Sequence, residues 1–266
     1  MLSNLQLNKQ KLFPKGETSN IMKTKNNLIF GRHPVVDAIR AGMTIDRLYL
    51  QQGTRGDFEK EIRQLSREYD IPLQYIPKER LNRIAGGNHQ GIAGFLSLLT
   101  YYRLEDVVPG IFEKGETPLI LLLDGVTDVR NFGAIARSAE VCGVHALVVP
   151  KAGSALINAD AIKTSAGALT RLHVCRENSL VTATGYLQAS GIQVFASDLK
   201  AGKYLFDLDL TAPAALVLGS EDEGVQQAIL SRVSERFVIP QKGGTDSFNV
   251  SVAAGIMLYE ALRQRF

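Results

Sequence analysis

Residues 119–137 read LILLLDGVTDVRNFGAIAR and give the strongest indication of fold class in the chain. The five consecutive aliphatic residues leave no polar face, which is typical of a strand buried on both sides in a parallel sheet. A polar loop follows the strand and leads into a segment with helical character. A two-sided apolar strand followed by a helix is the repeating unit of a doubly wound α/β fold.

Four further apolar runs rich in β-formers follow this stretch and are separated by segments with helical character. They are ALVVP at 146–150, IQVFASD at 192–198, ALVLGSED at 215–222 and RFVIP at 236–240. We therefore predict an α/β domain with a doubly wound parallel sheet over residues 117–266.

A second, smaller α/β domain is predicted over residues 28–100. Its expected helices cover 34–41, 58–69 and 78–85, and its expected strands cover 47–51, 73–77 and 91–99. The segment 101–116 mixes charged residues with glycine and proline and is predicted to be the linker. Residues 1–27 contain five lysines and one acidic residue, Glu17, and are predicted to be a basic disordered arm.

The composition indicates an ordinary globular protein, with 45% hydrophobic and 21% charged residues and a net charge of +3. Cys142 and Cys175 lack C-x-x-C spacing, which argues against a disulfide framework or a thiolate metal site. The histidines lack metal-ligand spacing, and we expect no metal; they are His33, His89, His145 and His173. No apolar run is long enough to span a membrane, and the N-terminus lacks the apolar core of a secretory signal. We therefore expect no membrane association and a cytoplasmic location.

Polar loops follow three of the predicted strands, with the sequences DGVTDVRNFGAIAR, GSEDEG and QKGGTDSFNVS. In open α/β sheets, ligands bind outside the carboxyl ends of the strands, so these loops predict one site at that edge. No G-x-G-x-x-G follows the first strand, and neither a phosphate-binding P-loop nor a G-x-S-x-G elbow is present. These absences argue against a dinucleotide-dependent oxidoreductase, a P-loop NTPase and a serine hydrolase.

Three stretches resemble, in order, the signature motifs of the SpoU (TrmH-like) RNA ribose 2′-O-methyltransferases. They are DVRNFGAIARSAEVCGV at 128–144, LVLGSEDEGV at 216–225 and IPQKGGTDSFNVSVAAGIMLYEA at 239–261. FGRHPVVDAIRAG at 30–42 and NHQGIAGF at 88–95 are similar to the RNA substrate-binding domain of the bacterial enzymes that methylate a guanosine of 23S ribosomal RNA.

This resemblance implies an S-adenosylmethionine-dependent methyltransferase that works as a homodimer on RNA. It also implies a deep C-terminal trefoil knot of the SPOUT type in the C-terminal domain. The implied substrate is a guanosine of 23S rRNA. The alternatives are a tRNA ribose 2′-O-methyltransferase and a catalytically silent, ribosome-associated RNA-binding protein of the same fold.

The resemblance implies catalytic roles for Asn131, Arg137, Glu221, Ser247 and Asn249. The spacing predicts that Asn131 caps a helix and that Arg137 lies inside that helix. Arg137 is compatible with a structural ion pair or with a role in the site, and the resemblance favours action on the ribose hydroxyl. The pKa of a guanidinium lies above about 12, so Arg137 is a poor base at neutral pH. Two alternatives are that it positions a phosphate or that it stabilises an alkoxide. Glu221 is expected to contact the substrate or Asn131.

The resemblance assigns the backbone around Gly219, Ile239 and Phe248 to the cofactor. Most members of the family carry leucine where this chain has Phe248. The missing side chain at Gly219 is expected to let the backbone approach the ligand closely. For Ser251, a helix-capping role is preferred over a catalytic one.

Five residues in two predicted N-terminal loops are candidate RNA contacts, namely Arg32, His33, Asn88, His89 and Gln90. Arginines and polar side chains in loops can hold phosphates and unstacked bases. Ordinary loop polarity explains the same residues equally well.

Overall fold

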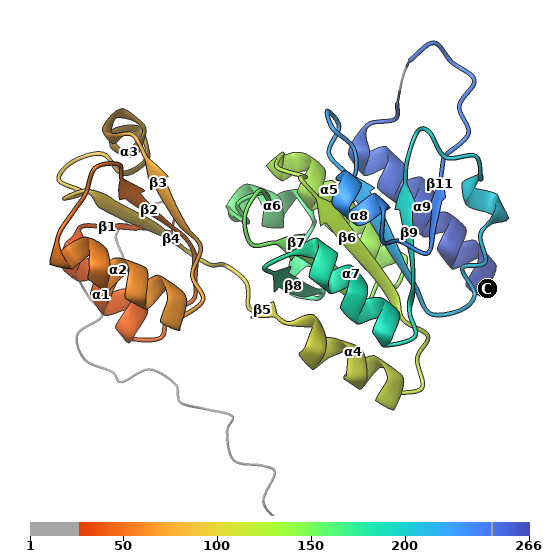
Figure 1. The fold of residues 1–266 in the computed structure, drawn as a ribbon, viewed down its shortest axis with the longest axis horizontal. Coiled ribbons are helices and arrows are strands. Elements are labelled where there is room, and N and C mark those ends of the chain that lie inside the picture. The colour runs from red at the N-terminus through yellow and green to blue at the C-terminus, as the bar shows by residue number, and fades with distance from the viewer. Residues whose placement is uncertain (1–26, 246) are drawn as a thin grey trace, which may run out of the picture.

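A computed structural model describes residues 27–245 and 247–266 of the protein. The predicted basic arm at 1–27 therefore lies outside the described residues, except for Asn27. The described chain forms two units, each with its own sheet (Figure 1).

The N-terminal unit is a small α/β domain, as the sequence predicts. Its elements are β1 (Leu28–Phe30), α1 (Arg32–Arg40), β2 (Ile45–Gln51), α2 (Asp57–Glu68), β3 (Leu73–Ile76), α3 (Lys78–Ala85) and β4 (Ile92–Leu96). The strand order is β1-β4-β2-β3, with β4 antiparallel to both neighbours and β3 parallel to β2. Apolar residues of α1 and α2, such as Val35, Ile39 and Ile62, pack in one core against the sheet.

The C-terminal unit has a seven-stranded sheet in the order β11-β9-β10-β6-β7-β8-β5, in which every neighbouring pair is parallel. The strands are β5 (Tyr101–Tyr102), β6 (Leu119–Asp124), β7 (Ala146–Pro150), β8 (His173–Glu177), β9 (Gln193–Ser197), β10 (Ala214–Gly219) and β11 (Glu235–Phe237). The α-helices are α4 (Leu104–Glu113), α5 (Val129–Val141), α6 (Ala159–Thr164), α7 (Leu180–Ala189), α8 (Gln227–Leu230) and α9 (Val250–Arg265). No helix within the described ranges is long and apolar enough to cross a membrane.

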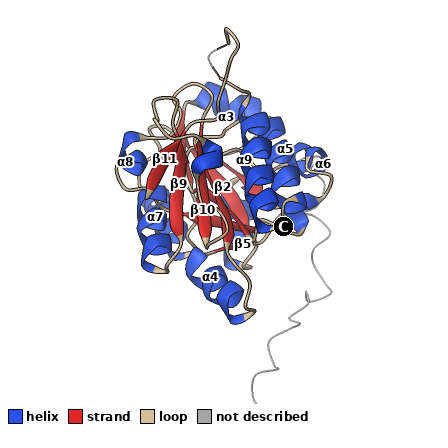
Figure 2. Cartoon of the chain, turned by 90° about the vertical axis from the view of Figure 1, so that its right-hand side faces the viewer, coloured by secondary structure: helices blue, strands red, loops and turns tan. Residues whose placement is uncertain are grey.

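Helices cover both faces of this sheet, which confirms the doubly wound prediction (Figure 2). Leu119, Leu121 and Leu123 of β6 pack into the core that contains α5 and α9, whereas Ile120 and Leu122 pack into the core on the opposite face, with α4 and α7. Successive side chains of a strand point to opposite faces. The uninterrupted apolar run of β6 is therefore required by burial on both sides.

The predicted linker at 101–116 is not an irregular connection. It forms β5, which adds an edge strand to the C-terminal sheet, and α4, which buries Leu104, Val108 and Ile111. Pro109 stands inside α4. Because its polar and turn-forming residues face outward while the apolar residues pack inward, composition alone is misleading here.

A buried ionic contact joins the two units. Asp46 of β2 is 4% exposed, accepts a hydrogen bond from the Tyr101 hydroxyl and pairs with Arg176 of β8 at 3.3 Å. The Arg176 guanidinium also lies 3.9 Å from the centre of the Tyr101 ring. Burial raises the pKa of both Asp46 and Tyr101, which the neighbouring arginine opposes. A second ion pair links Lys151 to Asp70.

Candidate functional site

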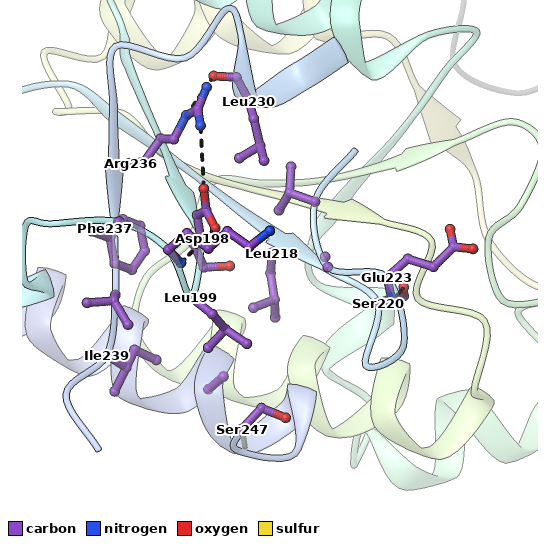
Figure 3. Close-up of a pocket in the computed structure, with 18 of the residues that line it drawn as sticks. Asp198, Leu199, Leu218, Ser220, Glu223, Leu230, Arg236, Phe237, Ile239 and Ser247 are labelled. Atoms are coloured by element: carbon purple, nitrogen blue, oxygen red, sulfur yellow. Dashed lines mark hydrogen bonds and ion pairs between the residues drawn. The ribbon is translucent and has the colours of Figure 1, made fainter. Parts of the chain in front are cut away.

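A cleft of about 1100 Å³ opens at the carboxyl ends of β9, β10 and β11. Its walls come from the loop after β9, the loop after β10, the end of β11 and the start of α9. Figure 3 shows Leu199, Leu218 and Ile239 gathered in the middle of this cleft, with Ser247 at the segment that leads into α9. The site thus lies at the edge of the sheet that the sequence predicts.

Three side chains from the three motifs form a closed hydrogen-bonded network beside this cleft. Glu221 Oε1 accepts from Asn131 Nδ2 at 3.3 Å and from Asn249 Nδ2 at 2.5 Å. Asn249 Nδ2 also donates to Asn131 Oδ1 at 3.3 Å, and the backbone N–H of Val250 donates to Glu221 Oε1 at 3.2 Å. The expected contact between Glu221 and Asn131 is confirmed. A single carboxylate oxygen therefore joins the start of α5 to the start of α9.

The helix caps differ from the prediction. Asp128 caps α5, because its Oδ1 accepts from the backbone N–H groups of Arg130 at 2.9 Å and of Asn131 at 2.8 Å. The prediction that Asn131 is the cap is wrong; it lies in the first turn, where its amide is free to bind Glu221. Asn249 caps α9 by accepting from the backbone N–H of Ser251.

Ser251 is likewise not a cap. It stands in the first turn of α9, and its hydroxyl donates to Asn249 Oδ1 at 2.6 Å. Because both Ser251 donors use that oxygen, the Asn249 amide group is turned so that its Nδ2 faces Glu221. Ser251 therefore orients a network residue, a role that the spacing of hydroxyls did not indicate.

Gly219, the last residue of β10, is required by close packing within the chain itself. A Cβ added at this position would lie 1.9 Å from the carbonyl carbon of Gly224 and 2.2 Å from the nitrogen of Val225. The close approach is thus made by the returning loop of the same chain. Gly219 still lines the cleft, together with Ile239 and Phe248.

Arg137 is not part of the network formed by Asn131, Glu221 and Asn249. It lies on the exposed face of α5, six residues and therefore about 9 Å of helix rise beyond Asn131. Within residues 27–245 and 247–266 it forms no hydrogen bond or ion pair. The structural ion pair considered for Arg137 is thus not observed in this part of the chain.

The cleft has an acidic wall. Five acidic side chains and three basic ones line it. The acidic residues are Asp198, Glu221, Asp222, Glu223 and Glu235, and the basic residues are Lys200, Lys203 and Arg236. Arg236 pairs with Asp198 at 3.5 Å (Figure 3). Lys203 pairs with Glu235 at 2.6 Å. Because these two cations are paired, the acidic residues of the loop at 221–223 make the electrostatic potential in the cleft negative.

The loop after β9 contributes to the cleft and is absent from the sequence-based site. Residues 197–203 form one wall, with Leu199 largely exposed there. The signal was present, because the apolar run IQVFASD ends in a polar turn at the same edge of the sheet as the three recognised loops. Without a distinctive motif, this turn looked like any other connection.

The structure also brings the two groups of candidate RNA-contact residues together, although Arg32 and His33 lie in the first turn of α1 and not in the predicted loop. The backbone N–H of Arg32 donates to Gln90 Oε1 at 3.0 Å, and Gly31 N donates to the carbonyl of Ile92 at 3.2 Å. Arg32, His33, Asn88 and Gln90 are exposed. The Arg32 guanidinium lies 4.4 Å from the centre of the Phe58 ring.

His89 differs from the four other candidate RNA contacts because it is only 6% exposed. Its Nδ1 accepts from the backbone N–H of Gly91 at 3.0 Å, so the ring proton lies on Nε2, which is 2.7 Å from Asn82 Oδ1. Both ring nitrogens are thus engaged inside the loop. Direct contact of this ring with RNA is contradicted by its burial, and its role is to hold the loop.

Comparisons with known proteins match both units. The model described as the SpoU rRNA Methylase family matches residues 118–259, and the model described as RNA 2′-O ribose methyltransferase substrate binding matches residues 28–102. A candidate TrmH family tRNA/rRNA methyltransferase of Staphylococcus haemolyticus is 31% identical over 238 residues, which cover 90% of this chain and 96% of the relative.

Two further similarities span almost the same length. A candidate TrmH family tRNA/rRNA methyltransferase of Bacillus subtilis, YacO, is 29% identical over 244 residues, covering 92% of this chain and 98% of the relative. The crystal structure of the SpoU methyltransferase AviRb from Streptomyces viridochromogenes in complex with AdoMet has a TM-score of 0.57 and 24% identity, and 90% of each chain is covered. At this identity the likeness to AviRb concerns the fold.

Proposed function

We propose, from the premise that this chain belongs to the SpoU rRNA methylase family, that it transfers a methyl group from S-adenosylmethionine to a ribose 2′-hydroxyl of RNA. The observation that carries this proposal is the network of Asn131, Glu221 and Asn249. Three loops far apart in sequence place polar groups beside a cleft large enough for a nucleoside cofactor.

The residues of the cleft suit S-adenosylmethionine. Leu199, Leu218 and Ile239 offer apolar surface for an adenosine, and the backbone around Gly219 and Phe248 is the proposed remainder of the cofactor site. The acidic loop at 221–223 favours a cationic sulfonium. When bound, the cofactor supplies the methyl group as an electrophile attached to that sulfonium.

The proposed catalytic set is divided by function. Asn131, Glu221 and Asn249 form a preorganised polar surface whose geometry is fixed before substrate arrives. Ser247 lines the cleft and is proposed to contact the reacting ribose. Arg137 is proposed to position a phosphate or to stabilise the alkoxide as the 2′-hydroxyl loses its proton, because a guanidinium is a poor base at neutral pH.

The proposed substrate is a guanosine of 23S rRNA, with tRNA as the alternative within the same family. The N-terminal unit is the proposed RNA-binding part, and its exposed Arg32, His33, Asn88 and Gln90 are the proposed contacts. A catalytically silent RNA-binding protein is disfavoured, since such a protein would not need the intact network around Glu221.

The assembly is proposed to be a homodimer with a deep trefoil knot around the cofactor loop. Helix α9 exposes Val252 and Tyr259, and these residues lie with Phe206 and Phe248 around one shallow apolar depression. A second copy of the chain is the proposed cover for this surface.

The proposed function has two direct tests. Calorimetric titration of the purified protein should show S-adenosylmethionine binding and no NAD binding. Mapping of ribose methylation in cells with and without the gene should show the loss of one 23S rRNA guanosine mark. Failure to bind S-adenosylmethionine would contradict the enzyme assignment, whereas loss confined to tRNA would contradict only the proposed substrate.

The loop held by His89 allows a separate test of the RNA-binding surface. His89→Ala removes the hydrogen bonds to Gly91 and Asn82. At about 1 kcal/mol for each bond, RNA binding should weaken by up to roughly 30-fold. Affinity for S-adenosylmethionine should not change, because the cleft lies in the other unit. Gel-shift and calorimetric titrations measure the two affinities.

Two partial substitutions sharpen this prediction. His89→Asn keeps an acceptor near the position of Nδ1, and His89→Gln keeps a donor near the position of Nε2, so each should show a smaller loss than His89→Ala. His173→Ala, at an exposed histidine of β8, should leave RNA affinity at the wild-type level. Equal RNA affinity in wild type and His89→Ala would rule out the proposed role of this loop.

A further inference from the structure

The carboxylate of Asp124 is an almost fully buried charge at the edge of the candidate site. Asp124 is the last residue of β6 and is 2% exposed. Its Oδ2 accepts from the backbone N–H of Gln226 at 2.7 Å, and its Oδ1 accepts from Gln226 Nε2 at 2.7 Å. Burial of a carboxylate is costly unless strong hydrogen bonds offset it. Both of these bonds come from one residue, and that residue lines the cleft.

The loop that Asp124 holds begins and ends beside it. In the parallel ladder of β6 and β10, Gly219 pairs in register with Asp124. The chain then leaves β10, closes a tight turn in which Gly224 N donates to the Ser220 carbonyl at 3.0 Å, and returns at Gln226. Asp124 thus fixes the exit of this loop through the backbone of β6 and its return through the carboxylate.

The same loop carries Glu221 into the network with Asn131 and Asn249. It also forms one wall of the cleft. A displacement of Gln226 would therefore move both the cofactor wall and the acceptor at the centre of the network. Asp124 itself does not line the cleft, so any effect it has on the reaction passes through Gln226.

We propose that Asp124 is a positioning residue that sets the shape of the S-adenosylmethionine cleft and the location of Glu221 by gripping Gln226 at two points. The proposal rests on the proposed function, because it names a further determinant of the same site. The proposal requires two things of the side chain at position 124. It must accept a hydrogen bond from the backbone N–H of Gln226, and it must form a donor–acceptor pair with the side chain at 226.

The polarity of this pair can be reversed. Asp124→Asn retains Oδ1 for the backbone N–H of Gln226, and its Nδ2 can donate to the Gln226 oxygen once that amide turns over. Gln226→Glu alone places two carboxylates in contact and removes a donor. The double variant Asp124→Asn/Gln226→Glu restores two complementary hydrogen bonds with donor and acceptor exchanged.

The test is calorimetric titration of S-adenosylmethionine into the full chain, followed by methylation kinetics on ribosomal RNA. Gln226→Glu should weaken cofactor binding at least about 10-fold, whereas Asp124→Asn and the double variant should stay within about threefold of wild type. The RNA KM should not change in any variant, because the N-terminal unit is untouched. Asp209→Asn, at an exposed acid that caps Thr211 in the loop before β10, is the matched control and should bind the cofactor normally.

Rescue separates positioning from general damage. Wild-type affinity in Gln226→Glu, or no recovery in the double variant, would overturn the proposal. If Gln226→Glu does not fold, restored folding and cofactor binding in the double variant supports the proposal, and a double variant that also fails overturns it. The wild-type titration reports the proposed function separately: if wild type binds no S-adenosylmethionine, that function fails and the positioning role fails with it.

Discussion

Replacing Arg137 with lysine should reduce methyl transfer by roughly 100-fold or more while leaving the affinity for S-adenosylmethionine unchanged. Arg137 is exposed on α5 and has no partner among the described residues, so its guanidinium is available to RNA. Lysine keeps the charge and loses the planar fork that can bind a phosphate or an alkoxide through two donors. Because the side chain packs against nothing polar, the variant should fold normally.

Single-turnover kinetics with saturating cofactor measures this effect, and calorimetry measures the cofactor affinity in parallel. Arg171→Lys is a suitable control, since Arg171 is also an exposed arginine and forms a surface ion pair with Glu140 at 2.7 Å. Exposed ion pairs contribute about 0–1 kcal/mol, so the control should retain full turnover. Near-normal turnover in Arg137→Lys would remove Arg137 from the catalytic set.

The strands that the sequence predicts well are those buried on both faces. The ranges of β6 and β7 agree with the runs LILLLD and ALVVP, because continuous apolar sequence leaves a central parallel strand no alternative position. The missed strands lie toward the edge. In HVCRE of β8 only Val174 and Cys175 are apolar, and β5 has only two residues, so neither offers the pattern of a core strand.

The candidate site, too, could be predicted from the sequence only in part. Motif resemblance located Asn131, Glu221 and Asn249, and the structure joins them in one network. The contact of Asp124 with Gln226 could not be predicted in the same way, because it spans 102 positions in sequence. Such a contact becomes visible only when the register of β6 and β10 is known. Caps were also misassigned, since several polar residues compete at each helix start and only backbone geometry selects among them.

Gly219→Ala should abolish measurable cofactor binding and should also lower the stability of the protein. The added Cβ would lie 1.9 Å from the carbonyl carbon of Gly224, and backbone atoms cannot yield as a flexible side chain does. The loop that carries Glu221 would have to move away from β10, which opens the cleft wall and breaks the contacts with Asn131 and Asn249. We expect S-adenosylmethionine affinity to fall by roughly 100-fold or more and unfolding free energy to fall by about 1–3 kcal/mol.

The control for this substitution lies in the same domain. Gly185 of α7 has open space where a Cβ would stand, so Gly185→Ala should stabilise the protein by about 0.5–1 kcal/mol through helix propensity and should leave cofactor binding unchanged. Neither glycine has a positive φ, so backbone strain does not distinguish the two substitutions, and the main difference is what the new methyl group meets. Thermal unfolding and calorimetric titration of both variants therefore separate steric closure of the loop at Gly219 from any general effect of adding a methyl group. Wild-type cofactor affinity in Gly219→Ala would show that the cleft does not depend on the close return of residues 224 and 225.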